Sequence, residues 1–72
     1  MKDELQRQAT MYLKLELTKQ DIGYKGLSNK LAQLGFEESP RQLANKINRG
    51  NFSLVFFLKC AKALGMTEIR LP

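Results

Sequence analysis

The stretch "ESPRQLANKINRGNFS", residues 38–53, begins with a helix-start signal and ends with a helix-stop signal. Ser39 is a candidate N-cap, Pro40 fits the first helical position, and Gln42 stands three residues after the cap, which is the spacing of a capping box. Gly50 suits a C-cap in the left-handed conformation. These signals predict a helix over residues 40–49.

The predicted helix divides into an apolar face and a basic face. Its apolar residues, Leu43, Ala44 and Ile47, are expected to point into the core. The remaining face is polar and carries no acid; its residues are Arg41, Gln42, Asn45, Lys46 and Arg49. Such a face is typical of a helix that lies against nucleic acid, and also of any amphipathic helix with a solvated outer side. The residues alone leave both interpretations open.

Helix-start and helix-stop residues along the chain predict three further helices, over residues 3–19, 24–34 and 54–64. Leucines at helical spacing mark the buried sides of the first two; with their neighbours these residues are Leu5, Ala9, Tyr12, Leu13 and Leu17, then Leu27, Leu31 and Leu34. The tail over residues 66–72 has no strong helical pattern, although Met66, Ile69 and Leu71 are candidates for packing. We therefore predict one all-α domain of four main helices over residues 1–72.

The last predicted helix is apolar around most of its circumference. Its only polar residues are Lys59 and Lys62, and its apolar residues spread over roughly two-thirds of a helical wheel. One face is enough to fill the core of a domain this small. We expect the excess, Val55, Phe56 and Leu58, to lie at the surface or in a homodimer interface, since wide apolar patches on monomers are unusual.

Composition suits a small cytoplasmic protein, and its basic charge is compatible both with a polyanionic partner and with a solvated surface that simply carries lysines. The 72 residues are 43% hydrophobic and 26% charged, as in ordinary globular proteins. All of the +5 net charge arises from residue 24 onward, where eight basic residues face three acids. One cysteine suits a reducing compartment, the charged start is unlike a signal peptide, and no apolar run approaches a membrane span.

Catalytic and metal-binding chemistry find little support. The chain has no histidine, the commonest general base, and one cysteine without histidine cannot make a zinc site. Cys60 falls in the apolar helix and is expected to be a core residue, while Glu37 and Glu38 are expected in a solvated turn. We therefore expect no enzyme activity, no cofactor, no metal and no small-molecule substrate.

A helix-turn-helix arrangement with a basic second helix suits the major groove of DNA. Arg41, Gln42 and Asn45 lie nearest the start of the helix and are the candidates for contacts with base edges. Contacts with phosphates are expected from Lys46 and Arg49, joined by Lys25 or Lys30 of the preceding helix.

Two resemblances add to these expectations. The run "LANKINRGNFSLVFFLKCAKALGM" resembles the second half of helix-turn-helix domains of the Cro and lambda-repressor type, in which an isoleucine stands three residues before the glycine that ends the recognition helix, here Ile47 and Gly50. The chain resembles still more closely a group of short bacterial proteins known only as a domain of unknown function. The residues carrying that resemblance are Tyr12-Leu13-Lys14, Asn45 to Ser53 and Phe56-Phe57.

The resemblance to the uncharacterised family implies a bacterial protein. The repressor resemblance implies a lambda-repressor-like helix-turn-helix core and a transcriptional regulator that binds duplex DNA, with the helix over residues 40–49 in the major groove. The chain departs from the repressor pattern between Gly35 and Gly50, which are about three residues further apart. The extra residues fall in "FEESP", residues 36–40, where Glu37 and Glu38 oppose phosphate binding if they face it. Two alternatives therefore stay open: a protein-interaction module that kept the fold, and an RNA-binding protein.

Overall fold

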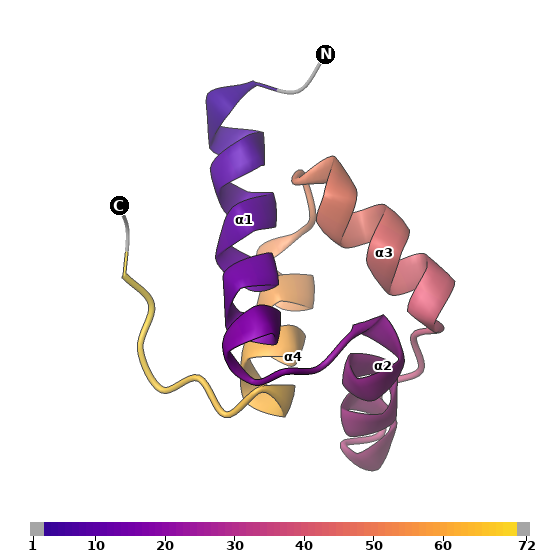
Figure 1. Ribbon diagram of the computed structural model, residues 1–72. Helices are drawn as coiled ribbons and strands as arrows, with labels where there is room; N and C mark the ends of the chain where they lie inside the picture. Colours follow the sequence, from indigo (N-terminus) through magenta and orange to yellow (C-terminus); the bar gives the residue numbers. More distant parts are fainter. Residues whose placement is uncertain (1–2, 71–72) are drawn as a thin grey trace.

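The computed structural model describes residues 3–70, which form four α-helices and no strand. The helices are α1 (Glu4–Lys19), α2 (Tyr24–Gln33), α3 (Pro40–Arg49) and α4 (Leu54–Ala63). In Figure 1, α2 and α3 lie on one side of α1, and the segment after α4 runs back along the other side. The predicted all-α class and all four helices are confirmed. Leu71 of the predicted tail lies outside the described residues.

Local capping chemistry sets where the helices begin. Asp3 and Ser39 each form a complete capping box, with Gln6 and Gln42 as their respective partners. The hydroxyl of Ser53 accepts a hydrogen bond from the Phe56 amide at the start of α4. These caps satisfy backbone N–H groups that have no partner within the helix. α2 and α4 each end one residue earlier than predicted, because Leu34 and Leu64 serve as C-caps.

The core lies at the centre of the four helices and is almost entirely aliphatic. Its fully buried side chains come from every helix and are Leu13, Leu27, Leu31, Leu43, Ile47 and Cys60. The aromatic residues Tyr24, Phe36, Phe52 and Phe57 pack around this cluster and remain partly exposed. Burial of Cys60 confirms its prediction as a core residue.

α3 is held against α1 through a close backbone approach. The Thr10 hydroxyl of α1 donates a buried 2.7 Å hydrogen bond to the Ile47 carbonyl in the last turn of α3. Next to it, Gly50 adopts φ +74° and lies against the backbone of Gln6. A Cβ atom on Gly50 would meet the Gln6 carbonyl oxygen and would lie 2.8 Å from the Thr10 hydroxyl. The end of α3 is therefore fixed on α1 by a contact that only glycine permits.

The structure corrects the sequence predictions at three apolar residues. Phe56 is not a surface residue: it is only 5% exposed, because α4 directs it into the core on the same side as Cys60. Leu5 is exposed because the first turn of the 16-residue α1 projects beyond α4 (Figure 1). Leu34, the C-cap that follows the last residue of α2, is 44% exposed, whereas the C-cap of α4, Leu64, is buried.

Candidate nucleic-acid interface

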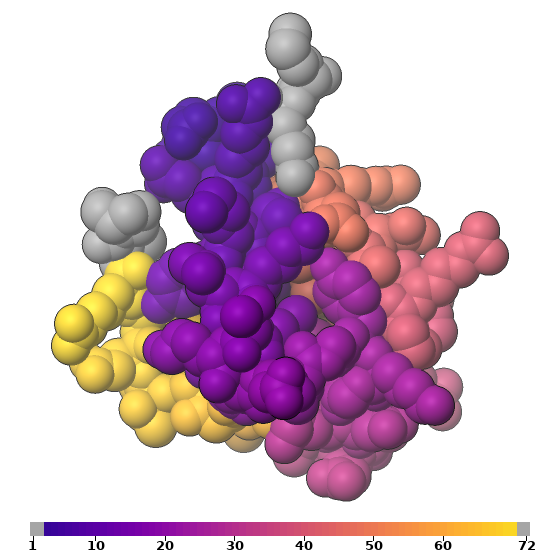
Figure 2. All heavy atoms as spheres, in the orientation of Figure 1, coloured from indigo at the N-terminus to yellow at the C-terminus, as the bar shows by residue number. Residues whose placement is uncertain are grey.

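The outer face of α3 is an exposed, polar and acid-free surface on one flank of the molecule. Leu43 and Ile47 are buried, and on a helical wheel Asn45 lies opposite them. The exposed side chains around Asn45 are those of Arg41, Gln42, Asn48 and Arg49. We call these five residues the α3 face. In Figure 2, side chains of this segment project outward on the right-hand flank.

Asn48 is a member of the α3 face that the sequence analysis did not include. It is exposed and stands three residues after Asn45 and seven after Arg41, which places all three residues along one side of the helix. Helical spacing alone was the available signal for it. Asparagine offers an amide oxygen and an amide nitrogen, the pair of groups that matches an adenine edge.

The two predicted amides differ in how free they are to bind a partner. The side-chain oxygen of Gln42 accepts a 2.9 Å hydrogen bond from the Ser39 amide, which completes the capping box and orients the side chain. The side chain of Asn45 has no hydrogen-bond partner among residues 3–70. Asn45 is therefore the better placed of the two to present both of its polar groups outward.

Lys46 is not on the free part of the helix. Its ammonium forms a 2.7 Å ion pair with a carboxylate oxygen of Glu38 and lies 5.1 Å from the centre of the Phe56 ring. Lys46 is thus turned to the flank of α3 that borders the α2–α3 connection and α4. The expected role of Lys46 as a phosphate contact requires this pair to open.

Glu38 is largely buried, although the sequence analysis expected a solvated turn. Its side chain is only 12% exposed, and its backbone carbonyl accepts a 2.6 Å hydrogen bond from the Ser28 hydroxyl of α2. One carboxylate oxygen pairs with Lys46, and the other is buried with no hydrogen-bond partner among the described residues. Glu37, by contrast, is exposed. The lengthened turn therefore presents one free carboxylate to solvent rather than two.

The connection between α2 and α3 is held on its other side by α4. The ammonium of Lys59 lies 5.1 Å from the centre of the Phe36 ring, and Phe36 packs against the core. A cation over an aromatic face is attracted by about 0.5–2 kcal/mol, depending on solvent exposure. Glu38 and Phe36 together fix the path of the chain into α3.

The predicted phosphate contacts on α2 are only partly placed by the structure. Lys25 is exposed and Lys30 is half-buried, and neither makes an ion pair within residues 3–70. Both stand on the helix that packs beside α3. Arg49 lines a shallow cleft of about 310 Å³ with Lys46, Asn51, Phe52, Ser53 and Phe56, where the end of α3 meets the start of α4.

A separate apolar surface lies on α4. Its exposed side chains are Leu54 (69%), Val55 (63%) and Leu58 (51%). Of the three predicted interface residues, Val55 and Leu58 are therefore available to a partner, and the buried Phe56 is not. Leu54 also borders a groove of about 270 Å³ whose other lining residues are Gln8, Ala9, Tyr12, Phe52, Phe57 and Ile69. No side chain that lines this groove is charged at neutral pH.

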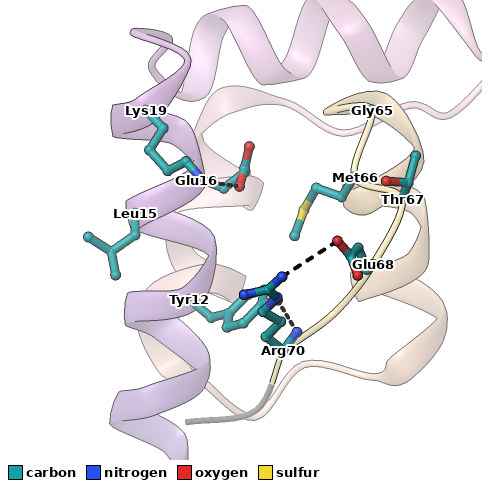
Figure 3. A pocket seen from close by; sticks show the side chains of 9 residues that line it. All are labelled: Tyr12, Leu15, Glu16, Lys19, Gly65, Met66, Thr67, Glu68 and Arg70. Atoms are coloured by element: carbon teal, nitrogen blue, oxygen red, sulfur yellow. Dashed lines mark hydrogen bonds and ion pairs between the residues drawn. The ribbon is translucent and has the colours of Figure 1, made fainter.

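Another cleft has a different character. It lies between α1 and the segment after α4 and measures about 530 Å³ (Figure 3). The backbone amide of Arg70 donates a 2.7 Å hydrogen bond to the Tyr12 hydroxyl, which ties this segment to α1. Its charged side chains are two acids, Glu16 and Glu68, and two bases, Lys19 and Arg70. Because these charges balance, the cleft does not select an anion or a cation by its net charge.

Metal-binding clusters and membrane-spanning helices are both absent from residues 3–70. No cluster of three or more acidic or cysteine side chains is arranged to hold a metal ion there. Within the same residues, each helix is too short or too polar to cross a membrane.

Comparison with known proteins identifies a family. Residues 5–69 match a domain of unknown function (DUF6471), and because this match spans most of the chain, the protein belongs to that family. This result confirms the resemblance to a short uncharacterised family. No curated protein and no solved structure matches the chain.

Proposed function

We propose that this protein is a small, non-catalytic DNA-binding protein of the bacterial cytoplasm, in which α2, its connection and α3 act as a helix-turn-helix unit. The observation that carries the proposal is the α3 face, because it combines two arginines and three amides on one exposed helix surface without an acid. These side chains match the hydrogen-bonding groups that bases present in the major groove.

The proposal assigns different roles to the residues of the α3 face. Arg41 and Asn45 contact base edges, since Arg41 lies in the first turn of α3, Asn45 lies about one turn later, and both point away from the core. Asn48 extends the same line of contacts, and Gln42 contributes within the limits of its capping bond. Arg49, with Lys25 and Lys30 of α2, contacts phosphates. Transcriptional regulation is the role that such a DNA-binding domain would serve.

The decisive experiment measures binding to a pool of random-sequence DNA duplexes by fluorescence anisotropy at several salt concentrations. We expect Arg49→Gln to weaken binding to the pool and to lower the log–log salt slope by about 0.9, the value for one lost phosphate contact. Arg41→Gln should instead weaken binding to the duplexes selected from the pool, because a base contact acts at the correct site. Arg70→Gln is the matched control, because Arg70 is an exposed arginine of the segment after α4, and this segment runs along the side of α1 away from α3 (Figure 1).

Two outcomes would refute DNA binding by the α3 face. One is the absence of measurable binding to the pool at low salt. The other is an equal effect of all three arginine substitutions, since binding would then follow net charge rather than the α3 face.

If the wild type binds the pool, selecting and sequencing the bound duplexes identifies the DNA site. RNA binding is distinguished by repeating the titration with a single-stranded RNA pool and a duplex RNA pool.

The exposed apolar residues of α4 favour a second function, which is self-association. Leu54, Val55 and Leu58 form a contiguous ridge at helical spacing, and a small domain gains stability by covering such a surface. We propose a homodimer through this ridge, which is compatible with DNA binding. A protein-interaction role without DNA binding is the alternative that remains if the wild type does not bind the DNA pool.

A further inference from the structure

We infer that Glu38 withholds Lys46 from the phosphates of DNA, so that the ion pair between them limits non-specific binding. This inference rests on the proposed DNA-binding function and concerns how the same surface is regulated. It starts from a contrast within α3: Arg41 and Arg49 are exposed and make no ion pair within residues 3–70, whereas Lys46 is paired at 2.7 Å.

The first step is that the pair is better shielded from solvent than an ordinary surface ion pair. The Glu38 side chain is 12% exposed and its second carboxylate oxygen is buried, so water and salt have limited access to the acid. Screening by salt is weaker for partly buried pairs than for exposed ones. Lys46 also lies over the Phe56 ring, which holds the ammonium on this flank of α3.

The second step is that Lys46 would contact phosphate if Glu38 did not hold it. Its side chain is still 45% exposed, and it lines the same shallow cleft as Arg49. A lysine in that position would add a further cation to the basic edge of α3. An ammonium paired with a carboxylate releases no counterion from DNA, because its charge is already neutralised.

The third step concerns which part of the affinity is limited. Phosphate contacts strengthen binding to every sequence equally, whereas base contacts from Arg41 or Asn45 strengthen binding to the correct site only. Neutralising Lys46 within the protein therefore removes one phosphate contact from binding to any duplex and leaves base recognition intact. Affinity for random DNA falls, and the ratio of specific to non-specific affinity is unchanged. Glu38 thus acts through Lys46 to limit the sequence-independent part of DNA binding.

The chain offers a matched control for the test. Glu37 precedes Glu38 in the same turn but is exposed and makes no ion pair within the described part of the chain. Glu37→Gln and Glu38→Gln remove the same charge from nearly the same place. Any effect that the two variants share comes from net charge, and any excess in Glu38→Gln comes from releasing Lys46.

The experiment titrates a random-sequence duplex with the full chain at several salt concentrations. We expect the log–log slope of Glu38→Gln to be steeper than that of Glu37→Gln by about 0.9, which is an additional 3.5-fold or so loss of affinity between 50 and 200 mM salt. Adding Lys46→Met to Glu38→Gln should restore the wild-type slope, because the double variant has the net charge of the wild type. Lys46→Met alone should leave the wild-type slope unchanged.

A purely structural role for Glu38 would change stability but not the salt slope, so circular dichroism and urea unfolding are recorded for every variant. Glu38→Asp provides a second route if Glu38→Gln does not fold, because its shorter side chain weakens the contact with Lys46 and keeps the charge. Its slope should fall between those of the wild type and a protein with a free Lys46.

The results separate the two proposals. If the wild type binds DNA and Glu38→Gln has the same slope as Glu37→Gln, the inference about Glu38 is wrong and the DNA-binding function stands. If Lys46→Met alone lowers the wild-type slope by about 0.9, Lys46 already contacts phosphate and the inference is again wrong. Failure of every folded variant to bind the duplex at low salt would overturn both proposals.

Discussion

At the scale of single residues, Gly50 carries two separate constraints. Its φ of +74° is unfavourable for an L-residue by about 1–2 kcal/mol, and its α-carbon faces the backbone of Gln6. We expect Gly50→Ala to lower the free energy of unfolding by clearly more than the strain alone, because a backbone carbonyl cannot move aside as a flexible side chain does.

Gly35 is the matched control for Gly50. It has φ +87°, but open space surrounds the position where a Cβ would be placed. Gly35→Ala should therefore show only the conformational part of the effect, about 1–2 kcal/mol. Urea unfolding of both variants provides the comparison. Equal losses of stability would mean that α3 does not depend on close contact with α1.

Cys60 makes stability depend on pH in the alkaline range. Burial raises the pKa of its thiol from the ordinary value of 9.0 to about 11; the nearby Glu38 carboxylate adds to the rise, and Lys46 opposes it. The unfolded chain loses the thiol proton near pH 9, whereas the folded chain retains it. The unfolded state then binds fewer protons, so stability falls as pH rises from about 9 to about 11, by up to about 1.4 kcal/mol per pH unit.

This pH dependence is measured as a difference between the wild type and Cys60→Ala. The substitution removes the titrating thiol and lowers stability at all pH values by leaving a small cavity. What matters is the slope: above pH 9 the free energy of unfolding of the wild type should decrease more steeply than that of the variant. Parallel curves would show that the thiol does not remain protonated in the folded protein.

At the scale of helices, the sequence predicted what local chemistry controls. The starts of α3 and α4 were predicted correctly because the Ser39 and Ser53 hydroxyls accept hydrogen bonds from backbone amides only three residues further along the chain. The capping box of α1 is equally local. Helical spacing likewise identified Leu43 and Ile47 as buried, since their side chains repeat on one side of α3.

Contacts between distant parts of the chain were not predictable from the sequence. Lys46 was expected on the outer face of α3 with Arg41 and Arg49, but its partner Glu38 lies outside the helix, in the connection. The direction of Phe56 depends on how α4 is rotated against the other helices, and an almost wholly apolar helix gives no signal for that rotation. The bond from Thr10 to Ile47 spans 37 residues and has no local signature.

At the scale of the whole molecule, the small size of the domain connects the proposed DNA binding with the proposed self-association. The chain measures 32 × 24 × 22 Å, and a single module of this size makes few contacts with DNA. Helix-turn-helix dimers bind half-sites about 34 Å apart, so two copies in side-by-side contact have suitable dimensions to place one α3 in each half-site. Self-association therefore belongs with DNA binding rather than competing with it.

The ridge on α4 is the surface through which we expect the two copies to meet. Leu58→Asp places a charge on this ridge, one turn after Leu54, and sedimentation equilibrium should then show a monomer where the wild type is a dimer. Leu15→Asp is the matched control, because Leu15 is exposed to a similar degree (57% against 51%) but lies on α1, away from the ridge.

We expect Leu15→Asp to remain dimeric. Leu58→Asp should lose affinity for a two-fold DNA site and retain weak binding to a single half-site. A wild-type protein that sediments as a monomer at its highest attainable concentration, or equal dissociation of both variants, would exclude the ridge as the interface. The weak half-site binding of the Leu58→Asp monomer would separate this result from a loss of DNA recognition, because the α3 face is unchanged in that variant.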